Sequence, residues 1–135
     1  MKSSFLLFLS VILLFACRKD QRVKNRIDGK WNVISANIYG FGEVEPEMVF
    51  NFDWCKTRKD DFCDFSAYDF AKNEMIEGVY SISEDGKSLV LDWKSNQNYN
   101  FEVFDIERLN FRTLILINKN PYSSFFSKMK FRSIN

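Results

Sequence analysis

Histidine is missing from this chain of 135 residues. Its absence excludes nucleophilic catalysis by a Ser-His-Asp or Cys-His arrangement. Three cysteines are too few soft ligands for a four-ligand zinc site when no histidine is present, and none of them forms a CxxC redox pair. The sequence has no glycine-rich phosphate loop and no dinucleotide fingerprint. We therefore expect neither an enzyme nor a cofactor site.

The chain also lacks an excess of charge of one sign and a long hydrophobic run. Lys2 is the only charged residue among the first 16, so the rest carries equal numbers of basic and acidic side chains. A nucleic-acid partner would need a basic face, and none is expected here. The longest apolar run, residues 5–15, is too short to cross a membrane, which takes about 20 apolar residues.

The N-terminal segment has the parts of a bacterial lipoprotein signal. A positive start at residues 1–2 and the apolar run precede Ala16, the small residue before a cleavage point. Leu14-Phe15-Ala16-Cys17 resembles a lipobox. The resemblance implies that residues 1–16 are removed and that Cys17 receives acyl chains such as palmitate. It also implies a cell-envelope protein anchored in the outer membrane, on its periplasmic or its cell-surface face. An uncleaved anchor is the alternative.

The remaining chain divides into a tether and one domain. Residues 17–27 are mostly polar and predict a lipidated, flexible tether with room for a short helical turn near residues 23–27. Residues 28–135 suffice for one domain. In an oxidising compartment, Cys55 and Cys63 predict a disulfide. The pair would flank a hairpin tip at residues 56–61, with Cα atoms about 5–6 Å apart. Free thiols or metal ligands are the alternatives.

Alternating apolar and polar residues predict an all-β domain. Fifteen phenylalanines and many β-branched residues favour strands, and Asp85-Gly86 is a strong hairpin signal. Strand spacing leaves no room for crossover helices, which predicts an eight-stranded antiparallel up-and-down meander closing into a barrel. A β-sandwich is the alternative. The expected strands are 30–38, 47–54, 62–70, 76–83, 88–94, 97–105, 112–118 and 124–133.

Gly29-Lys30-Trp31 at the start of the first strand is similar to the Gly-x-Trp signature of lipocalins. With Gly78-Val79-Tyr80, the hairpin at 83–88 and the strand 89–93, the domain resembles lipocalin-like lipoproteins of Bacteroidetes-type bacteria. The resemblance implies a closed barrel end plugged by Trp31 beneath a basic residue of the last strand. Arg132 is the residue expected there, with Lys130 as the second choice.

Large aromatic residues are the candidates for lining a ligand cavity. An eight-stranded barrel is only just wide enough to be filled by side chains or to hold one small ligand, so the same residues could fill the interior instead. They are Phe50, Phe52, Tyr80, Trp93, Tyr99 and Phe101. From Tyr99 the alternation runs through Val103 and then switches at Phe104, which predicts a bulge or the end of the strand.

Charged groups offer weaker candidates. Two acidic clusters and a basic row in the last strand are expected to be solvated surface charge, although the basic row could also meet anionic headgroups. The clusters lack the spacing of a calcium loop. The groups are Glu43, Glu45 and Glu47; Asp60, Asp61 and Asp64; and Lys128, Lys130 and Arg132.

Two functions remain open on the sequence alone. The first is a non-enzymatic, membrane-anchored lipocalin-like lipoprotein, monomeric, that binds a small apolar ligand beneath a gating loop at residues 39–46. The second is a structural or protein-interaction module with a filled barrel. Fold analogy cannot separate them. An interior cavity under the 39–46 loop would favour the first, and a packed interior would favour the second.

Overall fold

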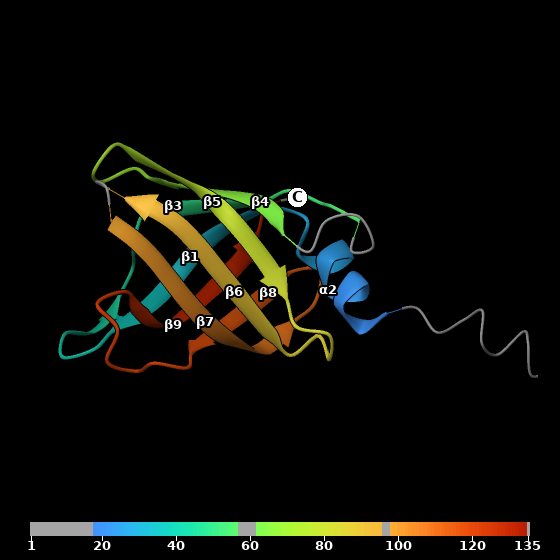
Figure 1. Cartoon of the computed structure of the whole chain (residues 1–135). Helices are drawn as coiled ribbons and strands as arrows, with labels where there is room; N and C mark the ends of the chain where they lie inside the picture. The colour runs from blue at the N-terminus through green and yellow to red at the C-terminus, as the bar shows by residue number, and fades with distance from the viewer. Residues whose placement is uncertain (1–17, 57–61, 96–97, 135) are drawn as a thin grey trace, which may run out of the picture.

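The computed structural model describes residues 18–56, 62–95 and 98–134. They form a closed antiparallel barrel of eight strands with one extra strand and a short helix at one end (Figure 1). The helix is α2 (Lys19–Ile27), and the strands are β1 (Gly29–Ile38), β2 (Gly42–Val44), β3 (Met48–Phe52), β4 (Cys63–Asp69), β5 (Glu74–Ile82), β6 (Ser88–Ser95), β7 (Asn98–Leu109), β8 (Thr113–Asn118) and β9 (Phe126–Ser133).

The barrel closes because the last strand pairs with the first. From β3 to β9 each strand pairs with its neighbour in sequence, and β9 then pairs with β1. This confirms the up-and-down barrel and excludes the sandwich. The eight expected strands correspond to β1 and β3–β9. The additional strand, β2, was not predicted. It lies within the expected gating loop and pairs with the second half of β1.

The alternation of apolar and polar residues matches the inner and outer faces of the barrel wall. In β6 and β8 every second residue is buried. The Asp85-Gly86 hairpin is also confirmed between β5 and β6. Gly86 adopts a left-handed φ of 71°, and the Asp85 carboxylate accepts hydrogen bonds from the Ser83 hydroxyl and the Lys87 backbone N–H. These bonds hold the pKa of Asp85 below its usual range.

Strand β7 is the place where the predicted parity was wrong. Phe104 is completely buried, whereas Tyr99 and Phe101 are exposed. The inward positions therefore run through Glu102 rather than through the two aromatic residues, because Glu102 pairs with buried Leu91. The register shift lies further along, between Ile106 and Arg108.

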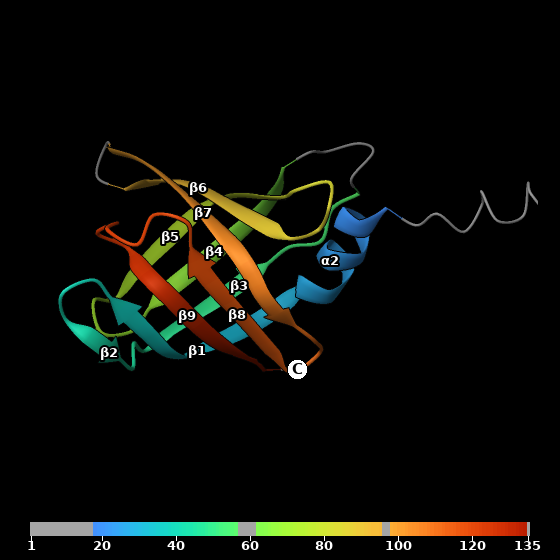
Figure 2. The same ribbon diagram turned by 90° about the horizontal axis from the view of Figure 1, so that it is seen from below.

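The segment expected to be a flexible tether is instead a helix docked on the barrel. Ile27, Lys24 and Asp20 of α2 are buried, and the indole N–H of Trp31 donates to the Ile27 carbonyl at 2.7 Å. In both ribbon views α2 lies at one end of the barrel and the β1–β2 hairpin at the other (Figure 2). We call these the anchor end and the distal end.

No helix in the described ranges is long and apolar enough to span a membrane.

Candidate functional site

The barrel interior is the first candidate site, and aromatic side chains fill it. Phe50, Phe52, Tyr80 and Trp93 are all buried, as expected for residues on the inner face. Phe50 and Phe65 stack with ring centres 6.3 Å apart, and the Phe52 and Tyr80 rings meet edge to face at 5.2 Å. Such pairs are a favourable packing geometry for aromatic rings. The four residues therefore build the core of the barrel.

The space left between these rings is too small for a ligand. The apolar gap between them is too narrow to admit a water molecule, and it is lined by Phe50, Phe65, Ala67, Ile76, Leu91, Trp93 and Phe125. The wall packs equally closely at Gly78. A Cβ atom there would lie 2.3 Å from the Asp92 carbonyl oxygen and 2.7 Å from the Trp93 Cβ. This part of the interior accommodates neither an apolar ligand nor a larger side chain.

The remaining two expected lining residues, Tyr99 and Phe101, lie outside the barrel and are 72% and 62% exposed. Instead of lining a cavity, Tyr99 carries the Lys94 ammonium over its ring at 5.1 Å. Their places on the inner face are taken by polar residues. Glu102 accepts hydrogen bonds there from the Asn118 amide and the Ser123 hydroxyl, which fixes the β8–β9 loop to β7.

Tyr80 is an ionisable residue in the barrel interior whose pKa is shifted. Its hydroxyl donates to the Asp53 carbonyl at 2.8 Å. Burial raises the pKa of Tyr80 well above its usual value, and the nearby Asp28 and Asp53 carboxylates raise it further. The phenol therefore stays neutral and serves as a buried hydrogen-bond donor.

The plug at the anchor end is partly as expected. Trp31 is buried on the inner face beside Phe50, its partner on β3. Arg132 does not cover it. In the β1–β9 ladder Arg132 lies opposite the exposed Asn32, one residue out of phase with Trp31, so it points outward. Lys130 is exposed as well. Helix α2 covers Trp31 in place of a basic residue from the last strand.

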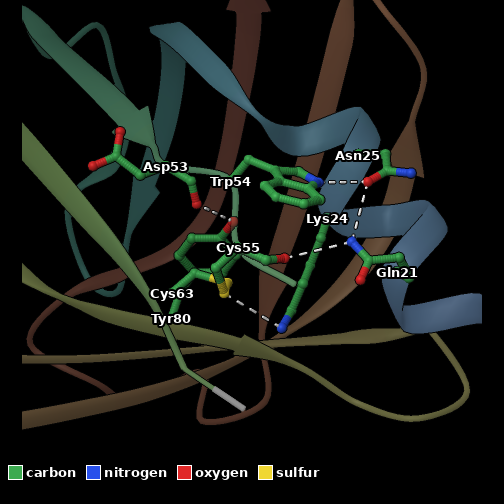
Figure 3. Close-up of a disulfide and its surroundings, with 8 residues drawn as sticks. All are labelled: Gln21, Lys24, Asn25, Asp53, Trp54, Cys55, Cys63 and Tyr80. Atoms are coloured by element: carbon green, nitrogen blue, oxygen red, sulfur yellow. Dashed lines mark hydrogen bonds between the residues drawn. A yellow bond between two sulfur atoms is a disulfide. The ribbon is translucent and has the colours of Figure 1, made fainter. Parts of the chain in front are cut away.

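The disulfide between Cys55 and Cys63 forms with Cα atoms 5.5 Å apart, as predicted. Figure 3 shows α2 lying beside it: the Lys24 ammonium is 3.8 Å from the Cys55 sulfur, and Gln21 donates to the Cys55 carbonyl at 3.5 Å. Trp54 donates its indole N–H to the Asn25 side chain at 2.6 Å. The bridge and α2 thus form one connected unit. The expected hairpin tip includes residues 57–61, which lie outside the described ranges.

The distal end has exposed aromatic loops and an open hollow. Tyr39 and Tyr122 meet edge to face at 4.9 Å across two loops, while Phe41 is 84% exposed. Beside β1 a surface hollow of about 600 Å³ is lined by Asn32, Val33, Ile34, Glu45, Pro46, Glu47 and Phe70. It lies near the expected gating loop. It is open to solvent and separate in its lining from the packed interior.

The acidic clusters behave as surface charge where the structure describes them. Glu43, Glu45, Glu47 and Asp64 are exposed, and Asp60 and Asp61 lie outside the described ranges. Within residues 18–56, 62–95 and 98–134, no group of three acidic or cysteine side chains has a metal-binding arrangement. In the basic row, Lys128 pairs with Glu107 at 3.4 Å.

Comparison with protein-family models, with curated proteins and with solved structures finds no match to this chain. The lipocalin-like resemblance therefore stays an expectation from the sequence. Cys17, the expected lipidation site, lies outside the described residues. The sequence predicted only a short helical turn near residues 23–27 and not the full, docked helix α2, although buried Asp20, Lys24 and Ile27 repeat at helical spacing with Val23.

Proposed function

We propose that this protein is a non-enzymatic, lipid-anchored barrel module of the cell envelope that presents its distal loops to a protein partner. Acylation at Cys17 would hold it in the outer membrane. Of the two functions left open by the sequence, this is the interaction module with a filled barrel. The lipocalin-like architecture is retained as a scaffold rather than as a ligand container.

The observation that carries this choice is the packed interior. A lipocalin-type carrier needs a space for its ligand, and small-molecule pockets commonly have about 300–1,000 Å³. The gap between the interior aromatic rings has about 0 Å³. Phe50, Phe52, Tyr80 and Trp93 occupy the volume that a ligand would need. The interior therefore supports a stabilising role.

The distal loops are the surface best suited to a protein partner. Tyr39, Phe41, Phe70 and Tyr122 are each more than half exposed, and aromatic residues are enriched in protein–protein interfaces. The Glu102 hydrogen bonds hold the loop that bears Tyr122. A rigid scaffold with exposed aromatic loops loses little conformational entropy on binding.

Two experiments test the two parts of the proposal. For the anchor, Cys17→Ser should abolish incorporation of labelled palmitate and move the chain out of the membrane fraction; unchanged labelling would refute acylation at this residue. For the loops, a photo-reactive phenylalanine analogue at Phe41 should crosslink to a discrete envelope protein in living cells. The same analogue at Phe111, equally exposed at the anchor end, is the control. Equal crosslinking from both positions would contradict a distal partner site.

A further inference from the structure

The distance between the expected lipid anchor and the folded domain is very short. Cys17 immediately precedes Arg18, and α2 begins at Lys19. Neighbouring Cα atoms across a trans peptide are about 3.8 Å apart. If Cys17 carries the acyl chains, the start of α2 therefore lies within a few ångströms of the anchored residue.

Helix α2 is fixed to the barrel on several sides, so it does not act as a loose spacer. Ile27 is fully buried and accepts the Trp31 indole N–H. On another side the helix approaches the β5–β6 hairpin so closely that a Cβ atom on Gly86 would lie 3.2 Å from the Lys19 carbonyl oxygen. Asn25 receives the Trp54 hydrogen bond on a third side. Helix α2 and the barrel therefore move as one body, and any surface that contacts α2 also orients the barrel.

The outward side of α2 is basic. Residues 18–27 include five basic side chains and one acidic side chain, Asp20. Arg18, Arg22 and Arg26 recur every four residues, which places them in one row along the helix, and all three are exposed. Asp20 is buried and paired with Arg18 at 3.0 Å. Guanidinium groups bind phosphates through paired hydrogen bonds.

Aromatic residues flank this arginine row. Trp54 is 51% exposed and contacts Asn25. Phe111, in the β7–β8 turn, is 82% exposed and shares a hollow with Asn25 and Arg26. Trp and other aromatic side chains favour the headgroup region of a bilayer, where cations meet phosphates. Exposed carboxylates also occur around this end, on Asp28, Asp53, Asp64, Glu84 and Asp85, together with the exposed basic residues Lys87 and Arg112 outside α2.

We propose that the anchor end lies directly against the phospholipid headgroups, with the arginine row of α2 on lipid phosphates and with Trp54 and Phe111 in the interface. This inference rests on the proposed lipid anchor and adds an orientation to it. The distal loops then point away from the membrane. Strand β1 alone has ten residues and spans about 30 Å, so the two ends of the barrel lie at clearly different heights above the bilayer.

Quenching of tryptophan emission by brominated phospholipids tests this orientation. The full chain is expressed with its own signal, checked for acylation by mass spectrometry, and reconstituted into vesicles of phosphatidylethanolamine and phosphatidylglycerol. Trp31 and Trp93 are 1% and 6% exposed, so Trp54 is the indole most open to the lipids. Brominated lipid should lower the emission of the native chain, and Trp54→Phe should remove most of that loss.

Phe41 and Phe111 provide a matched pair, 84% and 82% exposed at opposite ends. In the Trp54→Phe background, Phe111→Trp should restore the quenching and Phe41→Trp should leave it at the background level. Equal quenching of the two introduced indoles would overturn the proposed orientation but not the anchor. The same holds if neither indole is quenched although the protein is acylated and bound to the vesicles. A chain without acyl groups overturns both the anchor and the orientation.

Discussion

Replacing Trp31 tests how the anchor end of the barrel is held together. The indole is 1% exposed, packs opposite Phe50, and donates to the Ile27 carbonyl of α2 at 2.7 Å. Trp31→Ala removes the ring and leaves a cavity, and changes of this kind cost about 3–5 kcal/mol. A small domain commonly has about 5–15 kcal/mol of unfolding free energy in total. The variant should therefore remain folded but lose a large share of its stability.

Urea unfolding followed by far-ultraviolet circular dichroism measures this loss, with the disulfide intact in every protein. Trp31→Phe keeps most of the apolar volume and removes the hydrogen bond to α2, so it should cost about 1–2 kcal/mol. Trp54→Ala is the control, because that indole is half exposed at the same end and should cost about 1 kcal/mol or less. If Trp31→Ala lowers the unfolding free energy no more than Trp54→Ala, the packing of Trp31 against α2 does not stabilise the domain.

Three further perturbations test the rest of the fold. Reduction of Cys55–Cys63, which closes a loop of sequence separation 8, should lower the unfolding free energy by about 2.5 kcal/mol in denaturant titrations; complete unfolding on reduction would refute a core-stabilised barrel. Gly78→Ala should destabilise by about 1–3 kcal/mol, because its Cβ would lie 2.3 Å from a backbone oxygen; a neutral result would show that the interior is loosely packed. Burial raises the pKa of Tyr80 in the folded state, so its stability contribution is complete below the unfolded pKa of about 10 and falls as the pH rises toward the folded pKa. Unfolding midpoints between about pH 9 and 11 should decline less steeply in Tyr80→Phe, and parallel declines would argue against a buried, neutral phenol.

The meander could be predicted from the sequence because alternation in a strand reports its two faces directly. Strand β2 could not, since it has only three residues, begins at Gly42 with its positive φ, and gains its pairing from the far half of β1. The sequence also placed Tyr99 and Phe101 on the wrong face of their strand. The β6–β7 hairpin continues to their positions, where the outward face of the wall holds aromatic residues and the inward face holds Glu102.

The outward orientation of Arg132 at the anchor end was within reach of the sequence. Arg132 lies on the same face of β9 as Lys128 and Lys130 and on the opposite face from the buried Phe131. Its side chain therefore points away from the interior, where Trp31 lies. The docked helix was harder to predict, because Asp20 and Lys24 are buried with Ile27 and two charged residues normally indicate a solvated face. Only the closed barrel provides the contacts that bury them.

Native mass spectrometry of the protein purified from membranes tests most directly whether this protein is a lipid-anchored barrel with a filled interior. We expect the mass of a chain that begins at Cys17, carries its acyl chains, has lost two hydrogens to the Cys55–Cys63 bridge, and holds no additional small molecule. A co-purified apolar ligand that survives removal of detergent would contradict the filled interior. A chain that retains Met1 and has no acyl group would contradict the anchor.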